Sequence, residues 1–290
     1  MMKAYFTLFV MIIFFCVSTH GQVIHNQPLE KGGDIKRNTT YNLEEIKVRW
    51  KKAALENCTG VPCVVVPPQP SFTCGTSTVV DIDGNTYNTV LIGDQCWTKE
   101  NLKVTQYNDG TLIPLDTSGT ITGNSGQTWA PTNTGKRTVY EHNSTYLTTY
   151  GYLYNWYAAT DPRKLCPIGW HVPTDAEWTT MIQTLDPSQA VIFGDQSITA
   201  GGKLKKSDLW NVASPPSPGT DETGFSAIPG GWRTDSGAFF FVGTGAFFWS
   251  SGNAVPSSTA WARALGNSHS KVARYNFPKV LGFSIRCLKD

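Results

Sequence analysis

The cysteines of this chain limit its fold more than any other sequence feature. Seven occur in 290 residues, and Cys16 lies in an apolar run, residues 8–17, that follows the basic Lys3. A basic residue, a short apolar run and then small or polar residues at 18–21 are typical of a secretory signal peptide. Cleavage after Gly21 removes Cys16 and leaves six cysteines. An even number of cysteines suits pairing in an oxidising compartment.

The mature chain, from residue 22, is therefore expected to be a secreted or cell-surface protein with disulfides. The six remaining cysteines are Cys58, Cys63, Cys74, Cys96, Cys166 and Cys287. They allow roughly 15 pairings, which the residues alone leave open. No stretch has the ~20 apolar residues that a membrane-spanning helix needs. A lipoprotein anchored at Cys16 is the alternative, but Phe14 and Phe15 precede this cysteine where a small residue is expected.

Charge and composition point to no electrostatic partner. The formal net charge is +2, it falls to +1 when Lys3 is removed (2 − 1), and only 16% of residues are charged. Such a chain has no basic field to attract nucleic acid or an anionic membrane. With 12% aromatic residues, the chain has ample apolar area for a folded core.

Residues 22–71 differ from the rest of the chain in amino-acid composition and are interpreted as an N-terminal extension. Residues 42–56 carry Leu43, Ile46 and Trp50 at helical spacing, which predicts one short amphipathic helix. A helix of this length is marginal alone, so we expect Trp50 to dock on the main domain or on a neighbouring molecule. Self-association through residues 22–70 would follow from the second arrangement. Prolines 67, 68 and 70 indicate a stiff linker.

Residues 72–290 are predicted to form one β-rich α+β domain with short strands and few helices. Two strand patterns, 78–82 and 86–92, flank the turn sequence Asp83-Gly84-Asn85 and predict a hairpin. Thr174 and Glu177 form a capping box that predicts a helix over residues 175–185. Further strands are expected at residues 224–228, 238–242, 246–250, 260–265 and 283–288.

Several ordered blocks in this region resemble the Fibrobacter succinogenes major paralogous domain, a family of bacterial surface or secreted proteins. They include IGDQCWTKENL at 92–102, GYLYNW at 151–156, CPIGWHVPTDAEW at 166–178, GFSAIPGGWR at 224–233 and GFSIRCLKD at 282–290. The resemblance covers residues 72–290 and implies a C-type-lectin-like fold, shared with formylglycine-generating enzymes and hypervariable surface receptors. That fold implies a Cys166–Cys287 disulfide, with Cys74–Cys96 bracketing the hairpin. Cys58 and Cys63 could then close a small loop.

The catalytic and calcium-binding motifs of the related proteins are missing from this chain. Formylglycine-generating enzymes act through a pair of cysteines near the C-terminal end, where this chain has only Cys287. The Glu-Pro-Asn and Trp-Asn-Asp motifs of calcium-dependent lectins do not occur. We therefore expect no enzyme activity and no cofactor. Asp221 and Glu222 are a weak candidate for a calcium ion, for which a solvated turn is the simpler interpretation. His171 is expected to be a buried, hydrogen-bonded histidine.

A recognition surface is the remaining interpretation. In the related receptors the last third of the domain forms the ligand face. There the candidate ligand contacts are Trp261, Arg263, His269, Arg274 and Tyr275. Aromatic residues and arginine commonly anchor interfaces. We expect an adhesion or recognition module for an extracellular glycan or protein. The alternatives are a structural subunit that self-associates through its N-terminal segment, and an enzyme related to formylglycine-generating enzymes. A purely structural role is also possible from the sequence, in which Trp261 and Tyr275 belong to the hydrophobic core.

Overall fold

Two antiparallel hairpins at the start of the described chain lead into a five-stranded sheet. The computed structural model describes residues 72–117, 133–188, 192–214, 217 and 219–290, of which Phe72–Asp290 forms one compact unit. The signal peptide, the 42–56 helix, the Pro-rich linker, Cys58 and Cys63 lie outside the described residues. Strand order in this sheet is β1 (Thr78–Val80), β2 (Thr86–Ile92), β3 (Gln95–Thr98), β13 (Leu288–Lys289) and β6 (Trp170–His171).

The first hairpin is confirmed, with a shorter first strand than predicted. β1 ends at Val80 because the carboxylate of Asp81 turns back to accept hydrogen bonds from the backbone N–H groups of Asp83 (3.0 Å) and Asn85 (2.9 Å). Gly84 has φ of +85°, a backbone conformation that glycine adopts without strain. Both Gly84 and the preceding Asp81 therefore stabilise the turn.

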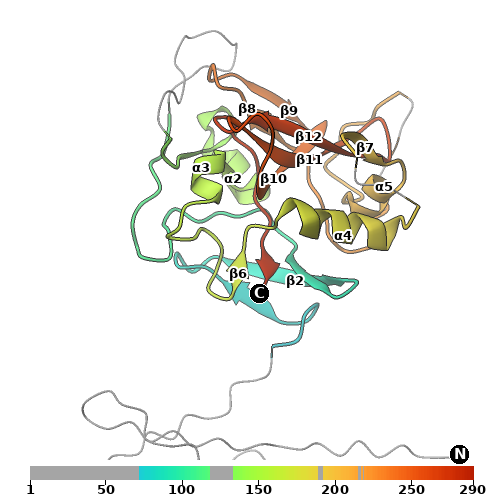
Figure 1. Ribbon diagram of the computed structural model, residues 1–290, viewed down its shortest axis with the longest axis horizontal. Helices are drawn as coiled ribbons and strands as arrows, with labels where there is room; N and C mark the ends of the chain where they lie inside the picture. The colour runs from blue at the N-terminus through green and yellow to red at the C-terminus, as the bar shows by residue number, and fades with distance from the viewer. Residues whose placement is uncertain (1–71, 118–132, 189–191, 215–216, 218) are drawn as a thin grey trace, which may run out of the picture. The chain divides into compact units, whose positions relative to one another are not determined.

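The larger sheet contains six strands and most of the C-terminal half of the domain (Figure 1). Its order is β7 (Gly194–Ser197), β12 (Val272–Pro278), β11 (Thr259–Gly266), β10 (Gly245–Asn253), β8 (Gly230–Arg233) and β9 (Phe239–Val242). The strand predicted at residues 224–228 is wrong, because Ser226 has φ of +53° and only Ala227 makes a bridge, to Lys205. The strand predicted at 283–288 is reduced to β13 and isolated bridges at Phe283 and Ser284.

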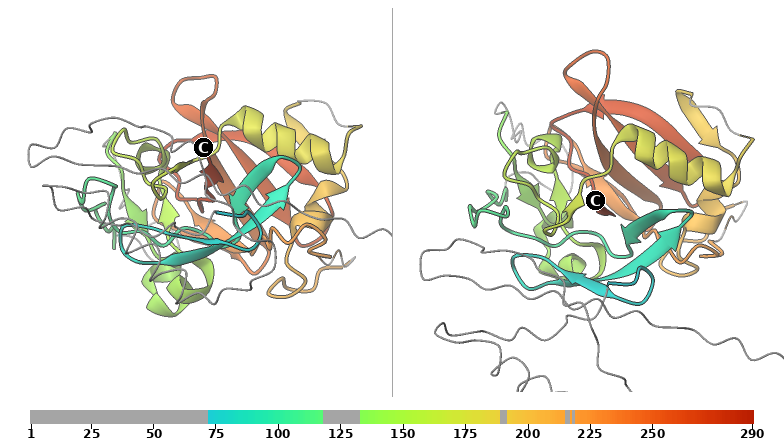
Figure 2. Two further views of the ribbon diagram at one scale, coloured as in Figure 1. Left: turned by 90° about the horizontal axis from the view of Figure 1, so that it is seen from below. Right: turned by 60° about the horizontal axis from the view of Figure 1, so that its bottom comes forward.

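Helix α4 (Asp175–Leu185) lies between the two sheets (Figures 1 and 2). It begins with the predicted capping box, in which Thr174 and Glu177 each bond the other's backbone N–H. Trp178, on its buried face, lies with ring centroids 4.8 Å from Trp97 and 5.6 Å from Phe248. One hydrophobic core therefore joins β3, α4 and β10.

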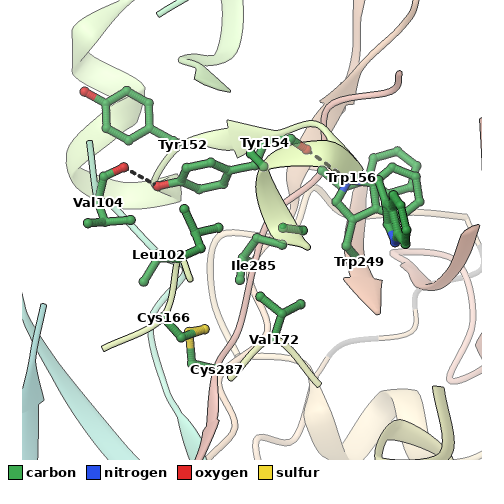
Figure 3. Close-up of a cluster of buried hydrophobic side chains, with 14 of the residues drawn as sticks. Leu102, Val104, Tyr152, Tyr154, Trp156, Cys166, Val172, Trp249, Ile285 and Cys287 are labelled. Atoms are coloured by element: carbon green, nitrogen blue, oxygen red, sulfur yellow. Dashed lines mark hydrogen bonds between the residues drawn. A yellow bond between two sulfur atoms is a disulfide. The ribbon is translucent and has the colours of Figure 1, made fainter. Parts of the chain in front are cut away.

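The remaining helices and strands are short. They are β4 (Arg137–Thr138), the 3-10 helix η1 (Tyr140–His142), α2 (Ser144–Tyr150), β5 (Leu153–Tyr154), α3 (Trp156–Ala159) and α5 (Ala200–Leu204). Most of them lie around a second core, whereas α5 contributes Ala200 and Leu204 to the first core. In the second core the Tyr154 hydroxyl donates to the Val104 carbonyl at 2.7 Å, and Trp249 Nε1 donates to the Tyr154 carbonyl at 2.9 Å (Figure 3). The buried polar atoms of Tyr154 and Trp249 are thus paired inside the core.

Two disulfides close the described domain, and both match the pairing that the resemblance implies. Cys74 bonds Cys96, and Cys166 bonds Cys287, with Cα atoms 5.8 Å and 5.9 Å apart. The second bond lies in the core drawn in Figure 3. Within the described residues, no helix has the length and apolar character to cross a membrane.

Candidate recognition surface

The five predicted contact residues lie on two neighbouring strands and the turn that joins them. Trp261 and Arg263 are on β11, Arg274 and Tyr275 are on β12, and His269 is in the intervening turn. Trp261, His269 and Tyr275 are half-buried, whereas Arg274 is 9% exposed and Arg263 is 0% exposed. The structure therefore brings the strand residues together but does not expose all of them.

The expectation that Arg263 is displayed on the surface is wrong, because the first turn of α4 covers it. Its guanidinium donates to the Asp175 carboxylate at 2.8 Å, and to the Asp175 carbonyl and the Thr179 hydroxyl at 3.0 Å each. Arg274 donates to the same carboxylate through Nε (2.9 Å) and Nη2 (2.7 Å). Two buried arginines thus hold one aspartate and fix α4 on the six-stranded sheet.

The pKa of Asp175 predicts how this cluster responds to acid. Burial of the carboxylate opposes its ionisation, but hydrogen bonds and charges of Arg274 and Arg263 outweigh burial and lower the pKa of Asp175. A carboxylate with a lowered folded-state pKa stabilises the fold above its unfolded-state pKa. That contribution is lost as pH falls through the folded-state pKa.

We therefore expect the wild-type chain to lose more unfolding free energy than Asp175→Asn when the pH is lowered from about 5 to about 2. Urea denaturation of both proteins at each pH measures this difference. Other carboxylates titrate in both proteins, so their contributions cancel in the comparison. Equal losses in the two proteins would contradict the assignment of Asp175.

Arg274 also stacks on Trp261, and Phe193 joins this pair to aromatic side chains on the other face of the sheet. The guanidinium carbon of Arg274 lies 3.5 Å from the centroid of the Trp261 ring. Phe193, just before β7, has its ring 6.4 Å from that of Trp261 and 5.3 Å from that of Tyr275. β7 pairs only with residues 272–274 of β12, so the β12 edge at Tyr275 stays open to Phe193.

Trp261 alternates with Arg263 and lies on the face of the sheet that α4 covers, whereas Tyr275 pairs with Ala262 and lies on the other face. From Tyr275, aromatic side chains continue along that other face of the six-stranded sheet. We call this set the aromatic band; its members are Phe193, Trp232, Phe240, Phe241, Phe247, Trp261, Tyr275 and Phe277. Each ring centroid lies 5.3–6.4 Å from that of another member. Phe193, Phe240 and Phe241 are 63%, 47% and 51% exposed, and the other members are half-buried. Clustered exposed apolar groups, such as those at the two ends of the band, are typical of interaction sites.

Most of the band could not be identified from sequence. The run Phe239-Phe240-Phe241 is a local signal, since three consecutive phenylalanines in a strand cannot all point into one core. Phe193 carries no such signal, because its place beside Tyr275 depends on β7 joining β12. The pairing of distant strands is what assembles the surface.

The two other sequence candidates have local structural roles. The carbonyl of His269, together with that of Gly266, accepts a hydrogen bond from the buried Lys205 ammonium at 3.0 Å. The carboxylate of Asp221 accepts from the Ser226 backbone N–H (2.8 Å) and hydroxyl (2.7 Å), which closes the turn. Glu222 is exposed and lies 3.6 Å from Lys203. The described parts of the chain contain no group of three His, Cys, Asp or Glu side chains placed to hold a metal.

His171 lies at the domain surface rather than in the core, contrary to the prediction. Its side chain is 34% exposed; Nδ1 lies 2.6 Å from an Asp290 carboxylate oxygen, and Nε2 lies 3.1 Å from the Glu177 carboxylate. Glu177 is the capping-box residue of α4. The histidine was correctly predicted to be hydrogen-bonded, and it links β6 to the start of α4.

The motif residues quoted above maintain the scaffold. Arg286 is fully buried, and its guanidinium donates to Asn101 Oδ1 (2.8 Å) and to the carbonyls of Thr98 (3.1 Å), Phe225 (2.8 Å) and Ser226 (3.0 Å). These acceptors come from two of the motif blocks. The guanidinium therefore ties three distant segments together inside the domain.

Comparison with known protein families covers the segment that contains these motifs. The model of the Fibrobacter succinogenes major domain matches residues 90–289, which is more than half of the chain. No curated protein and no solved structure gives a significant match. With its family motifs placed throughout the described domain, the chain belongs to the Fibrobacter succinogenes major domain family.

Proposed function

We propose that residues 72–290 form a non-catalytic recognition module with a C-type-lectin-like fold, which binds an extracellular glycan through the aromatic band. The observation that carries the proposal is the unbroken row of partly exposed rings from Phe241 to Phe193. We place the module outside the cell, as a secreted or surface protein, because its two disulfides suit an oxidising compartment.

The shape of the band favours an extended ligand. The row from Phe241 to Phe193 has members on β9, β8, β10 and β12 and directly before β7. It therefore crosses five gaps between strands, although β11 contributes no ring to this face. At about 4.8 Å a gap, the row is roughly 24 Å long. A polysaccharide segment can follow such a row with several sugar rings, whereas a compact small molecule would use only part of it.

The chemistry of the band favours sugar rings. The C–H groups on one face of a sugar ring form an apolar surface with a slight positive charge, which packs on the negative face of an aromatic ring. The eight members are phenylalanine, tryptophan and tyrosine residues, which add no formal charge to the band, and the Arg274 guanidinium beside Trp261 already donates to the Asp175 carboxylate. We therefore propose a neutral glycan as the ligand.

The Cys166–Cys287 disulfide supports the proposal over the alternative of an oxidase of the formylglycine-generating kind. Cys287 is the residue at which the family resemblance would place a reactive cysteine, and its sulfur is bonded to Cys166. A disulfide-bonded sulfur is no nucleophile until the bond is reduced, because the thiolate is the reactive form.

Substitutions in the band are expected to weaken glycan binding without unfolding the protein. Phe193→Ala and Phe241→Ala should each reduce affinity for the bound polysaccharide about tenfold, a typical loss for an interface anchor. Both side chains are at least half exposed, so the melting temperature should stay nearly unchanged. Affinity electrophoresis of the full chain in gels containing neutral polysaccharides measures binding.

Ile168→Ala is the matched control, because Ile168 is an exposed apolar residue (87%) outside the band. Its affinity should equal that of the wild type. If no neutral polysaccharide retards the wild-type chain, or if all three variants migrate like it, the band is not a glycan site.

A further inference from the structure

We propose that a hollow beside α2 is a second binding site, which takes a single neutral sugar residue. The hollow has a volume of about 410 Å³ and is lined by Asp83, Asn85, Lys103, Thr105, Thr148 and Tyr152. This volume is near the small end of the range for ligand pockets, which suits one ring rather than a chain. None of these residues belongs to the aromatic band, so the site is independent of the function proposed above.

Hydrogen bonds hold one wall of the hollow in place. The buried Asp81 carboxylate accepts from Asn85 Nδ2 at 2.9 Å and from the Tyr87 hydroxyl at 2.7 Å. The Tyr87 oxygen in turn accepts from the Lys103 backbone N–H at 2.8 Å. The β1–β2 turn and the Lys103 segment are therefore fixed relative to each other before any ligand arrives. A preformed wall reduces the entropy that binding costs.

Several polar atoms on the lining are available to a ligand. Asn85 Oδ1 and the hydroxyls of Thr105, Thr148 and Tyr152 have no hydrogen-bond partner among the described residues. Figure 3 shows the Tyr152 hydroxyl pointing away from Tyr154 and the disulfide. Lys103 Nζ donates to the Thr148 carbonyl at 2.7 Å, which leaves further ammonium hydrogens. This set both donates and accepts, as the hydroxyls of a sugar require.

The charges and apolar groups of the lining narrow the ligand class. Asp83 and Lys103 carry opposite charges, so the lining has no net charge to attract an ionised ligand. The Asp83 carboxylate accepts from the Thr105 backbone N–H and from Gln106 Nε2 (2.7 Å), which already satisfies much of it. Leu147 contributes apolar surface for the C–H groups of a ring. A neutral polyhydroxylated ring fits these features better than a phosphate or a carboxylate.

Saturation-transfer NMR of the full chain with D-glucose, D-galactose, N-acetyl-D-glucosamine and, as the charged comparison, D-glucuronate tests the site. We expect at least one neutral sugar to receive saturation, and D-glucuronate to bind more weakly than that sugar. Thr148→Val and Tyr152→Phe each remove one free hydroxyl. Each should weaken that sugar about three- to tenfold, the usual loss for one hydrogen bond.

Thr149→Val is the matched control, because Thr149 is the exposed neighbour of Thr148 on α2 and does not line the hollow. It should bind the sugar like the wild type. The proposal is overturned if no neutral sugar receives saturation, if D-glucuronate binds more tightly, or if Thr148→Val and Tyr152→Phe bind like Thr149→Val. Loss of sugar binding in Phe241→Ala alone would place the sugar on the band instead.

Discussion

Asp175→Ala is expected to lower the free energy of unfolding by about 3–5 kcal/mol, because it leaves two buried guanidiniums without their shared carboxylate. Arg263 is fully buried and Arg274 is 9% exposed, so water cannot replace the lost partner well. The same change also detaches the start of α4 from β11 and β12. Urea unfolding at neutral pH, followed by tryptophan fluorescence, measures the loss.

Two controls separate this electrostatic cause from a general effect of removing an aspartate. Asp208→Ala breaks an exposed pair with Lys206, whose side chains are 62% and 38% exposed, and should change stability by less than about 0.5 kcal/mol. The triple variant Asp175→Ala, Arg263→Met and Arg274→Met removes the charges together and should regain part of the loss. If Asp175→Ala alone costs under about 1 kcal/mol, the pairing contributes little to the fold.

Removing the Cys166–Cys287 disulfide by the double change to alanine is expected to cost about 2–5 kcal/mol. The bond joins residues 121 positions apart, so it restricts the unfolded chain strongly. The Cys74–Cys96 bond spans only 22 positions and is the internal comparison. Loop-closure entropy predicts that the longer loop contributes about 1.5 kcal/mol more.

Thermal and urea unfolding of the two double-alanine variants tests this ranking. Non-reducing peptide mapping of the wild type first establishes that both bonds form in the purified protein. A larger loss from Cys74→Ala with Cys96→Ala than from Cys166→Ala with Cys287→Ala would show that local packing, rather than loop length, dominates these bonds.

Local signals in the sequence predicted the local structure well. The capping box of Thr174 and Glu177 marked the start of α4, and Asp83-Gly84-Asn85 marked the first hairpin turn. Each signal acts through contacts within a few residues, so it can be recognised without knowing the rest of the fold. The pairing of Cys166 with Cys287 needed the family resemblance, because spacing along the chain does not determine which cysteines meet.

Non-local contacts explain two incorrect predictions, the exposure of Arg263 and the strand at residues 224–228. Strand alternation correctly placed Arg263 and Leu265 on one face, but it could not reveal that α4 covers that face. An arginine among alternating alanines therefore looked like a surface residue. The 224–228 segment had strand composition, yet Ser226 has a positive φ and its carbonyl accepts from the distant Arg286. Its conformation depends on a residue 60 positions away.

The position of β13 has a consequence for how the domain is made. This strand pairs with both β3 and β6, so it fills the middle of the five-stranded sheet rather than its edge. During synthesis β3 and β6 emerge early, but the gap between them stays open until residue 288 leaves the ribosome. We infer that the nascent chain stays unable to close this sheet throughout elongation.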